Sequence, residues 1–325
     1  LRDTYYTRRD GGPLVFSTAL QSLSRHPSVT PAFDEDFVTE YFTCGFRTFG
    51  TRTPLRDTHL FPPGSVTTIS SGALDLSTRS YWDPHYCPVE RPFSEVLDSF
   101  VDRIEAAVAE RMGPDRHYGL TLSGGLDSRL VLAAVPEDRR SSLTAYHCAG
   151  WESREVRAAR AAAEAADVTF RRLDRDADYH RQALQRNTAL SNFVGTFEQA
   201  HLEGFMPAIG DEVDELLTAS FADSNFKGFS FPRYSLDLGP VGTVHLPFLK
   251  PMESVDGYVD FWLREPPEYL RPSRDPEAIL RSEIRRRDGG VDHHGVTYDS
   301  PAALFSCGML TPRTNGSVLF MLQSL

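Results

Sequence analysis

The sequence predicts an α/β fold in which a parallel sheet carries helices on both faces, preceded by a segment of strands and hairpins. Two observations support this fold class. From residue 118 onward, short apolar strands alternate with helical patterns, as in proteins built on a parallel sheet. Before residue 89, turn signals at Asp10-Gly11-Gly12 and Ser71-Gly72 separate short strands around one helix, expected near residues 30–43.

A proline-bearing stretch at residues 84–92 indicates a linker between these two parts. A length of 325 residues suggests about two domains, so we predict one at 1–88 and another at 89–325. Apolar residues at helical spacing predict a helix over 93–112. Beyond it, the expected strands are 118–122, 142–147, 168–173 and 213–218, and the expected helices are 128–135, 152–166 and more between 179 and 206.

Composition excludes two classes of function. The net charge of −11 argues against a non-specific nucleic-acid binder, which would normally be basic. No stretch approaches the roughly 20 apolar residues that a membrane span needs. The cysteines are scattered without a CxxC pair, which favours structural thiols in a reducing cytoplasm. They are Cys44, Cys87, Cys148 and Cys307.

The segment 118–134, YGLTLSGGLDSRLVLAA, says most about function. A short apolar strand runs into two adjacent glycines, which allow a tight turn, and then into an apolar helix. The backbone amides of such a turn and the positive end of the helix dipole suit a bound phosphate. Asp127 would repel that phosphate unless a divalent cation lay between them. We therefore expect a site for the pyrophosphate of ATP with Mg²⁺, formed by Ser123, Gly124, Gly125, Leu126, Asp127 and Ser128.

The alternative is an ordinary glycine-rich turn in which Asp127 only caps the helix. The full six-residue string between a strand and a helix favours the nucleotide interpretation. Neither the lysine-bearing P-loop pattern nor GxGxxG occurs, so kinase-like and dinucleotide sites have no support.

Four stretches together resemble the asparagine synthase family of ATP-pyrophosphatases. SGGLDSR at 123–129 resembles the pyrophosphate loop of that family, and LLTASFADSNFKG at 216–228 resembles its second metal-binding loop. GGPLVFSTALQSL at 11–23 is similar to the last glutaminase strands and the following helix, and LFPPGSV at 60–66 with YWDP is similar to the hairpin that leaves that domain. The sequence around these stretches also resembles haloarchaeal members of the family.

This resemblance implies an adenine nucleotide alpha-hydrolase-like domain at 89–325, after the C-terminal part of an Ntn-type glutaminase domain at 1–88. It implies that ATP adenylates a carboxylate, such as aspartate or an analogue, with pyrophosphate release, and that ammonia from glutamine then attacks. The family's glutaminase uses an N-terminal cysteine, whereas this sequence starts at Leu1. We therefore expect a fragment.

The second loop carries the other expected magnesium ligand, Asp223, which follows a predicted strand and would emerge on the same sheet edge as Asp127. A solvated loop aspartate is the alternative. Ser220 and Ser224 stand where the family has acidic residues, and Phe221 stands where it has glycine. These departures question asparagine formation more than ATP binding. Lys227 could approach a phosphate, although a surface lysine is equally expected.

Other interpretations stay open. A different acceptor is possible, such as a sugar acid of a surface polysaccharide, a peptide carboxylate or a β-amino acid. Another ATP-pyrophosphatase or a non-catalytic nucleotide-binding protein would also fit the loop. The remaining polar candidates carry no assigned role: Tyr146, His147 and Cys148 at a strand end, Glu152 and Glu155 as complements of a helix dipole, Asn192 and Gln199 as helix-exterior or acceptor-binding residues, and His293-His294 as a loop.

Overall fold

The computed structural model describes residues 4–8, 12–44, 51–62, 64–70, 75–81, 89–190, 192, 202, 204–219, 222, 233–250, 254–287, 290–293, 296–300 and 303. The chain forms two compact units. Unit 1 comprises Leu1–Cys87, Thr188–Thr196 and Gly228–Gln323, and unit 2 comprises Pro88–Asn187, Phe197–Lys227 and Ser324–Leu325. These units are defined by contacts between residues and are not continuous in sequence. The domain boundaries 1–88 and 89–325 therefore stay a prediction.

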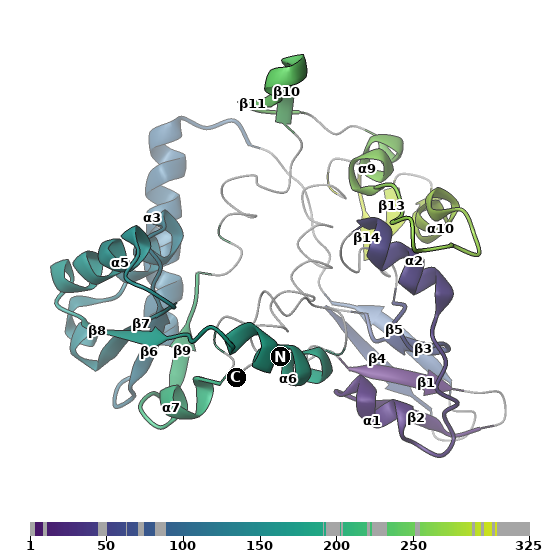
Figure 1. The fold of residues 1–325 in the computed structure, drawn as a ribbon, viewed down its shortest axis with the longest axis horizontal. Helices are drawn as coiled ribbons and strands as arrows, with labels where there is room; N and C mark the ends of the chain where they lie inside the picture. The colour runs from purple at the N-terminus through teal and green to yellow at the C-terminus, as the bar shows by residue number, and fades with distance from the viewer. Residues whose placement is uncertain are drawn as a thin grey trace. The chain divides into compact units, whose positions relative to one another are not determined.

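Unit 1 consists of small antiparallel sheets and short helices (Figure 1). Its first sheet has the order β2-β1-β3, and its second pairs β4 with β5, which gives the hairpin expected after residue 60. Strands β10 and β11 form another hairpin, and β12-β13-β14 form a meander. The strands are β1 Tyr5–Arg8, β2 Leu14–Ser17, β3 Thr58–Leu60, β4 Ser65–Ile69, β5 Leu76–Ser80, β10 Arg233–Asp237, β11 Thr243–Leu249, β12 Arg285–Arg287, β13 Gly290–His293 and β14 Val296–Tyr298. The helices are α1 Leu20–Ser24, α2 Glu35–Cys44, η3 Gly239–Val241, α9 Val255–Trp262 and α10 Pro276–Glu283.

Two apolar cores hold unit 1 together. One joins Tyr5 and Leu60 of the first sheet to Leu20 and Leu23 of α1. The other joins early and late parts of the sequence, because Cys44 at the end of α2 packs with residues of α9, α10 and β14. Its members are Cys44, Val255, Tyr258, Val259, Trp262, Leu280, Ile284, Tyr298 and Ala303.

Unit 2 is built on a four-stranded parallel sheet of order β8-β7-β6-β9 (Figure 1). Tyr118 pairs with Leu143 on one side and with Glu215 on the other, so β6 is an inner strand. The strands are β6 Tyr118–Thr121, β7 Leu143–Ala149, β8 Thr169–Asp174 and β9 Glu215–Leu217. The helices are α3 Phe93–Arg111, α4 Leu126–Ala133, η1 Glu137–Ser142, α5 Arg154–Ala165, α6 Tyr179–Leu190 and α7 Met206–Gly210.

Helices cover both faces of this sheet, as the alternation of side chains along the strands requires. On one face, Leu120 of β6 and Ala145 of β7 pack with Val108 of α3, Leu132 of α4 and Ala159 of α5. On the opposite face, a second core gathers around α7, with Tyr146, Leu202, Ile209, Cys148, Leu173, Met206 and Leu216. The predicted α/β class, a parallel sheet with helices on both faces, is confirmed.

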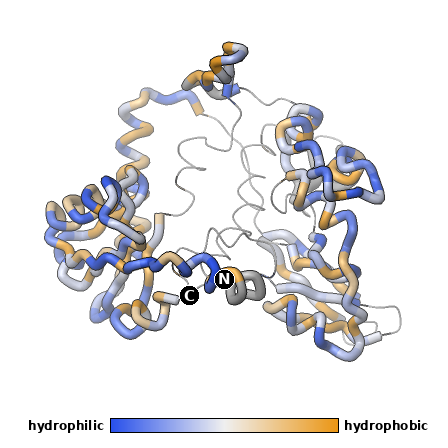
Figure 2. Tube along the Cα trace, in the orientation of Figure 1, coloured by the Kyte–Doolittle hydropathy of each residue, from blue (hydrophilic) through white to orange (hydrophobic). Residues whose placement is uncertain are grey.

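The helix predicted over 93–112 is confirmed as α3, but its apolar spacing does not make it a core helix. Apolar and polar residues alternate along it (Figure 2). Within α3, which is fully described, only Val108 is buried, while Phe93, Leu97 and Val101 are exposed. Among the described residues, no helix is long and apolar enough to cross a membrane.

Candidate functional site

The candidate loop leaves β6 at the point where the order of the sheet reverses. From β6 the chain moves outward to β7 and β8 and then returns to β9 on the other side of β6. In open α/β sheets, ligands bind beyond the carboxyl ends of the strands at such a switch point. The loops after β6 and β9 therefore leave neighbouring strands at this edge, where Thr121 Oγ1 donates to the Leu217 carbonyl oxygen at 3.5 Å.

Two serines hold the loop closed. Ser128 Oγ accepts a hydrogen bond from Ser123 N at 2.9 Å and donates one to the Ser123 carbonyl oxygen at 3.1 Å. Because that bond uses the one hydroxyl proton of Ser128, the Ser123 hydroxyl is the donor in the 2.9 Å contact between the two Oγ atoms. Ser123 Oγ also accepts from Gly125 N at 3.1 Å. Both hydroxyl protons are thus used within the loop, which gives Ser128 a structural role. Direct ligand binding by either serine stays a prediction.

Gly124 is required by close packing rather than by an unusual backbone angle. Neither Gly124 nor Gly125 has a positive φ. A Cβ at Gly124 would stand 3.0 Å from the Glu155 carbonyl oxygen and 3.1 Å from Glu155 Cα, in the first turn of α5. A Cβ at Gly125 would meet the Ser123 Oγ at 3.1 Å. The loop therefore lies directly against the N-terminal turn of α5, and our expectation of a turn-forming role for Gly124 missed this contact.

Asp127 lies in the first turn of α4 at the carboxyl edge of the sheet and is partly buried. Gly125 occupies the N-cap position with φ −73° and ψ 163°, so Asp127 is the second residue of the helix and not its cap. Leu126, the first helical residue, is 67% exposed. Asp127 therefore does not act as the helix N-cap, and its role at a nucleotide stays a prediction.

Asp223, the second predicted magnesium ligand, lies outside the described residues. So do Ser220, Phe221, Ser224, Lys227, Gln199 and His294. The preceding residue, Ala222, is buried, and its amide donates to the Ala219 carbonyl oxygen at 3.3 Å. Among the described residues, no three His, Cys, Asp or Glu side chains gather as a metal site. Magnesium binding by Asp127 and Asp223 stays a prediction.

The end of β7 places three candidates on two faces of the sheet. His147 Nδ1 lies 2.7 Å from the Leu122 carbonyl oxygen. A carbonyl only accepts, so Nδ1 carries the proton and the imidazole fixes the residue just before the loop. Tyr146 and Cys148 belong to the core around α7. Burial raises the pKa of the Cys148 thiol to about 12, which keeps it protonated and unreactive near neutral pH.

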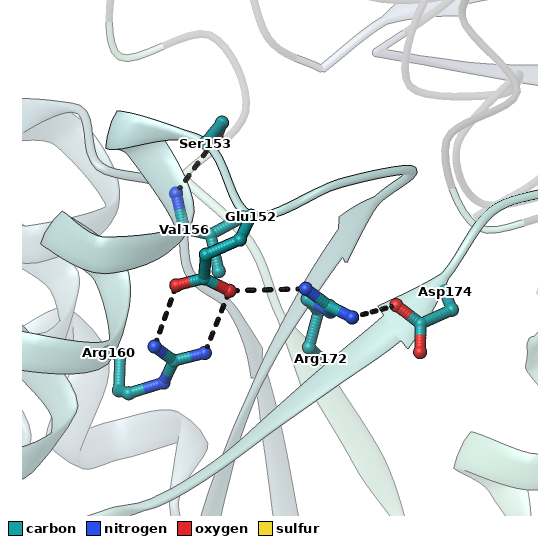
Figure 3. Close-up of polar contacts among 6 residues, drawn as sticks. All are labelled: Glu152, Ser153, Val156, Arg160, Arg172 and Asp174. Atoms are coloured by element: carbon teal, nitrogen blue, oxygen red, sulfur yellow. Dashed lines mark hydrogen bonds and ion pairs between the residues drawn. The ribbon is translucent and has the colours of Figure 1, made fainter.

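Glu152 lies outside the helix that it was expected to open. Ser153 is the N-cap of α5, and its Oγ accepts from Val156 N at 3.2 Å. The Glu152 carboxylate binds Arg160 of α5 at 2.7 and 3.1 Å and Arg172 of β8 at 3.1 Å (Figure 3). Arg172 also binds Asp174 at 2.7 Å. These ion pairs connect α5, whose first turn packs on Gly124, to strand β8.

The helix-exterior interpretation of Asn192 is wrong. Asn192 is 2% exposed, with φ of 52°. Its Oδ1 accepts from Leu20 N at 2.7 Å, and its Nδ2 donates to the Thr18 carbonyl oxygen at 3.4 Å. The side chain therefore stabilises the start of α1 in unit 1.

Comparison with known proteins finds a family match for the part of the chain that carries the loop. The asparagine synthase family matches residues 99–235, which include the sheet, the loop and Asp223. This segment belongs to the asparagine synthase family. The match agrees with the predicted adenine nucleotide alpha-hydrolase-like fold and supports ATP use and ATP-dependent amidation or ligase chemistry in general.

Other comparisons add little. No curated protein matches the sequence. One similar solved structure is the NH3-dependent NAD synthetase from Campylobacter jejuni subsp. jejuni, in complex with nitrate ion. It shares 13% identity, with 60% of this chain and 93% of that chain covered and a TM-score of 0.30. A resemblance this weak bears on neither fold nor function.

Proposed function

We propose that the chain is an ATP-dependent carbon–nitrogen ligase that activates a substrate carboxylate as an acyl-adenylate. The observation that carries this proposal is the Ser123–Ser128 loop at the switch point of a parallel sheet, inside an asparagine synthase segment. The first-turn amides of α4 have no carbonyl partners within the helix and therefore suit an anionic polyphosphate. ATP would bind with its pyrophosphate portion on this loop.

In the proposed reaction, a carboxylate oxygen attacks the α-phosphorus of ATP, the bond from that phosphorus to the α,β-bridging oxygen breaks, and pyrophosphate leaves. An amine then attacks the acyl carbon, loses a proton and displaces AMP. The chain's own residues would contribute chiefly by orienting the ATP and by stabilising developing charge. The carboxylates of Asp127 and Asp223 are oxygen ligands of the kind that Mg²⁺ prefers. The ion would neutralise charge on the leaving pyrophosphate.

The acceptor and the nitrogen source are part of the proposal. Aspartate or an analogue is the first candidate acceptor, with ammonia derived from glutamine, and the glutaminase-like segment 1–88 is the motivation for the latter. Ser220 and Ser224 remove two carboxylates that the family usually has in this loop, which motivates testing other acids. A cytoplasmic location is also proposed, in line with four scattered cysteines that form no CxxC pair.

Exchange of labelled pyrophosphate into ATP tests this function. The purified chain is assayed with Mg²⁺, ATP and one carboxylate at a time: aspartate, a uronic acid, a peptide carboxylate or a β-amino acid. Exchange with aspartate supports asparagine-type synthesis, and exchange with another acid redirects the assignment to that acceptor. ATP binding without exchange for any acid would overturn the ligase and leave a nucleotide-binding protein.

A matched pair of variants links the activity to the loop. Asp127→Asn should abolish exchange with little loss of folding, because the change removes one carboxylate charge from a partly buried helical position. Asp138→Asn removes a similar charge from the surface of η1 in the same unit and should leave exchange unchanged. Full exchange by the Asp127→Asn variant would refute the assignment of Asp127.

A further inference from the structure

Arg129 lies in the first half of α4 with its guanidinium beside the candidate loop. Its Nε donates to the Gly125 carbonyl oxygen at 3.1 Å, so the side chain runs back toward the helix N-terminus, as helical side chains favour. The carbon of that carbonyl is bonded to Leu126 N, the first amide of α4. The guanidinium of Arg129 is therefore hydrogen-bonded to the same peptide group that contains Leu126 N, the first of the amides proposed to bind phosphate.

The guanidinium of Arg129 has no carboxylate partner in the described part of the chain. The contact with Gly125 uses Nε, which leaves four N–H groups on the two terminal nitrogens. Some other arginines of unit 2 are paired with carboxylates: Arg160 and Arg172 bind Glu152, and Arg171 binds Glu212. Arg129 is exposed, and its contact with Gly125 holds the guanidinium at the loop without an ion pair to any described carboxylate.

We infer that Arg129 is a further binding residue for the polyphosphate of ATP, an inference that rests on the proposed function. A guanidinium binds phosphate oxygens in pairs through its planar set of donors. Its charge also offsets the carboxylate of Asp127, which alone would repel the ligand. Segment 118–134 contains no lysine. The whole sequence has only two lysines, Lys227 and Lys250, among its 34 basic residues. Arginine is therefore the cation available within this segment.

Calorimetric titration with inorganic pyrophosphate, ATP and adenosine, each in the presence of Mg²⁺, tests the inference. Arg129→Ala should weaken pyrophosphate and ATP binding about tenfold to a hundredfold, as the loss of charge-assisted bonds predicts. Adenosine carries no phosphate, so its affinity should not change. Arg129→Lys should recover part of the loss, because it restores the charge but not the paired donors.

Arg103→Ala supplies the control, because it removes one exposed arginine from α3 without touching the loop. It should leave all three affinities unchanged. If the unaltered chain binds ATP while Arg129→Ala binds pyrophosphate equally well, the role of Arg129 is refuted and the proposed function stands. If the unaltered chain binds neither ATP nor pyrophosphate, both are refuted. Equal weakening of adenosine and ATP would indicate a structural effect and would also overturn the inference.

Discussion

Ser128 Oγ bonds to both the amide nitrogen and the carbonyl oxygen of Ser123, so one buried hydroxyl closes the loop between β6 and α4. Gly124, which packs on α5, lies between these two serines. The loop is therefore formed before any ligand arrives, which lowers the cost of ordering it on binding.

Ser128→Ala should destabilise unit 2 by about 1–3 kcal/mol, because it removes two hydrogen bonds to partly buried backbone groups of Ser123. Urea unfolding measures the change in unfolding free energy. Ser123→Ala is the comparison. It removes the bonds of Ser123 Oγ to Ser128 Oγ and to the exposed Gly125 amide, but Ser128 Oγ keeps both of its backbone partners, so the variant should cost less. Unchanged stability of Ser128→Ala together with lost ATP binding would mean that the hydroxyl serves the ligand instead.

Gly124→Ala should both destabilise the chain, by about 1–3 kcal/mol, and weaken ATP binding, because the new Cβ would collide with backbone atoms of Glu155. Gly125→Ala is the matched variant, since its Cβ would approach one side-chain atom, Ser123 Oγ, and no backbone atom. Thermal unfolding and ATP titration are measured for both. Equal behaviour of the two variants would show that α5 does not press on the loop at Gly124.

The pKa of Glu152 should be lower than that of an ordinary glutamate, first because of its hydrogen bond from Arg160 and then because of the charges of Arg160 and Arg172. Carbon-detected NMR titration of the carboxyl group measures it. Arg160→Ala should raise this pKa more than Arg172→Ala does, and added salt should raise it in the unaltered chain because the groups are exposed. The reverse order of the two variants would contradict the geometry of Figure 3.

Tyr146 should make the stability of unit 2 fall at alkaline pH. Burial, aided by the 2.7 Å hydrogen bond to Glu212, raises the pKa of its phenol from 10.0 to about 12. Between those values the unfolded chain loses the proton while the folded chain keeps it, so the unfolding free energy decreases as pH rises. Below pH 10 the contribution is fully present.

Tyr146→Phe removes this titration and is the control. Its deficit in unfolding free energy relative to the unaltered chain should shrink as pH rises from about 10 toward about 12. Urea unfolding across this range gives both curves, and the other tyrosines contribute equally to each. A deficit that stays constant with pH would show that the Tyr146 pKa is not raised.

Local patterns in the sequence predict the elements of unit 2 well. The strand predicted at 168–173 is Thr169–Asp174, and the helix predicted at 152–166 is Arg154–Ala165. Periodicity and turn residues suffice for such elements because they depend on near neighbours. The strand–loop–helix context of residues 118–134 likewise follows from its own residues.

Interactions between distant residues explain what the sequence could not predict. An acidic residue such as Glu152 is typical of the first turn of a helix, yet its partners, Arg160 and Arg172, lie 8 and 20 positions away. Asn192 contacts Leu20 across 172 positions, and Gly124 is constrained by Glu155 on the next helix. The exposed apolar residues of α3 could not be predicted either. Their spacing indicates a helix, but it does not indicate which other elements pack against that helix.

Asn192 anchors a nine-residue stretch, Thr188–Thr196, that belongs to unit 1 although the sequence on either side of it belongs to unit 2. Neither unit is a single continuous piece of polypeptide. A transplant of residues 88–227 into another protein would therefore take Thr188–Thr196 out of unit 1 and deprive Leu20 N of its acceptor, Asn192 Oδ1.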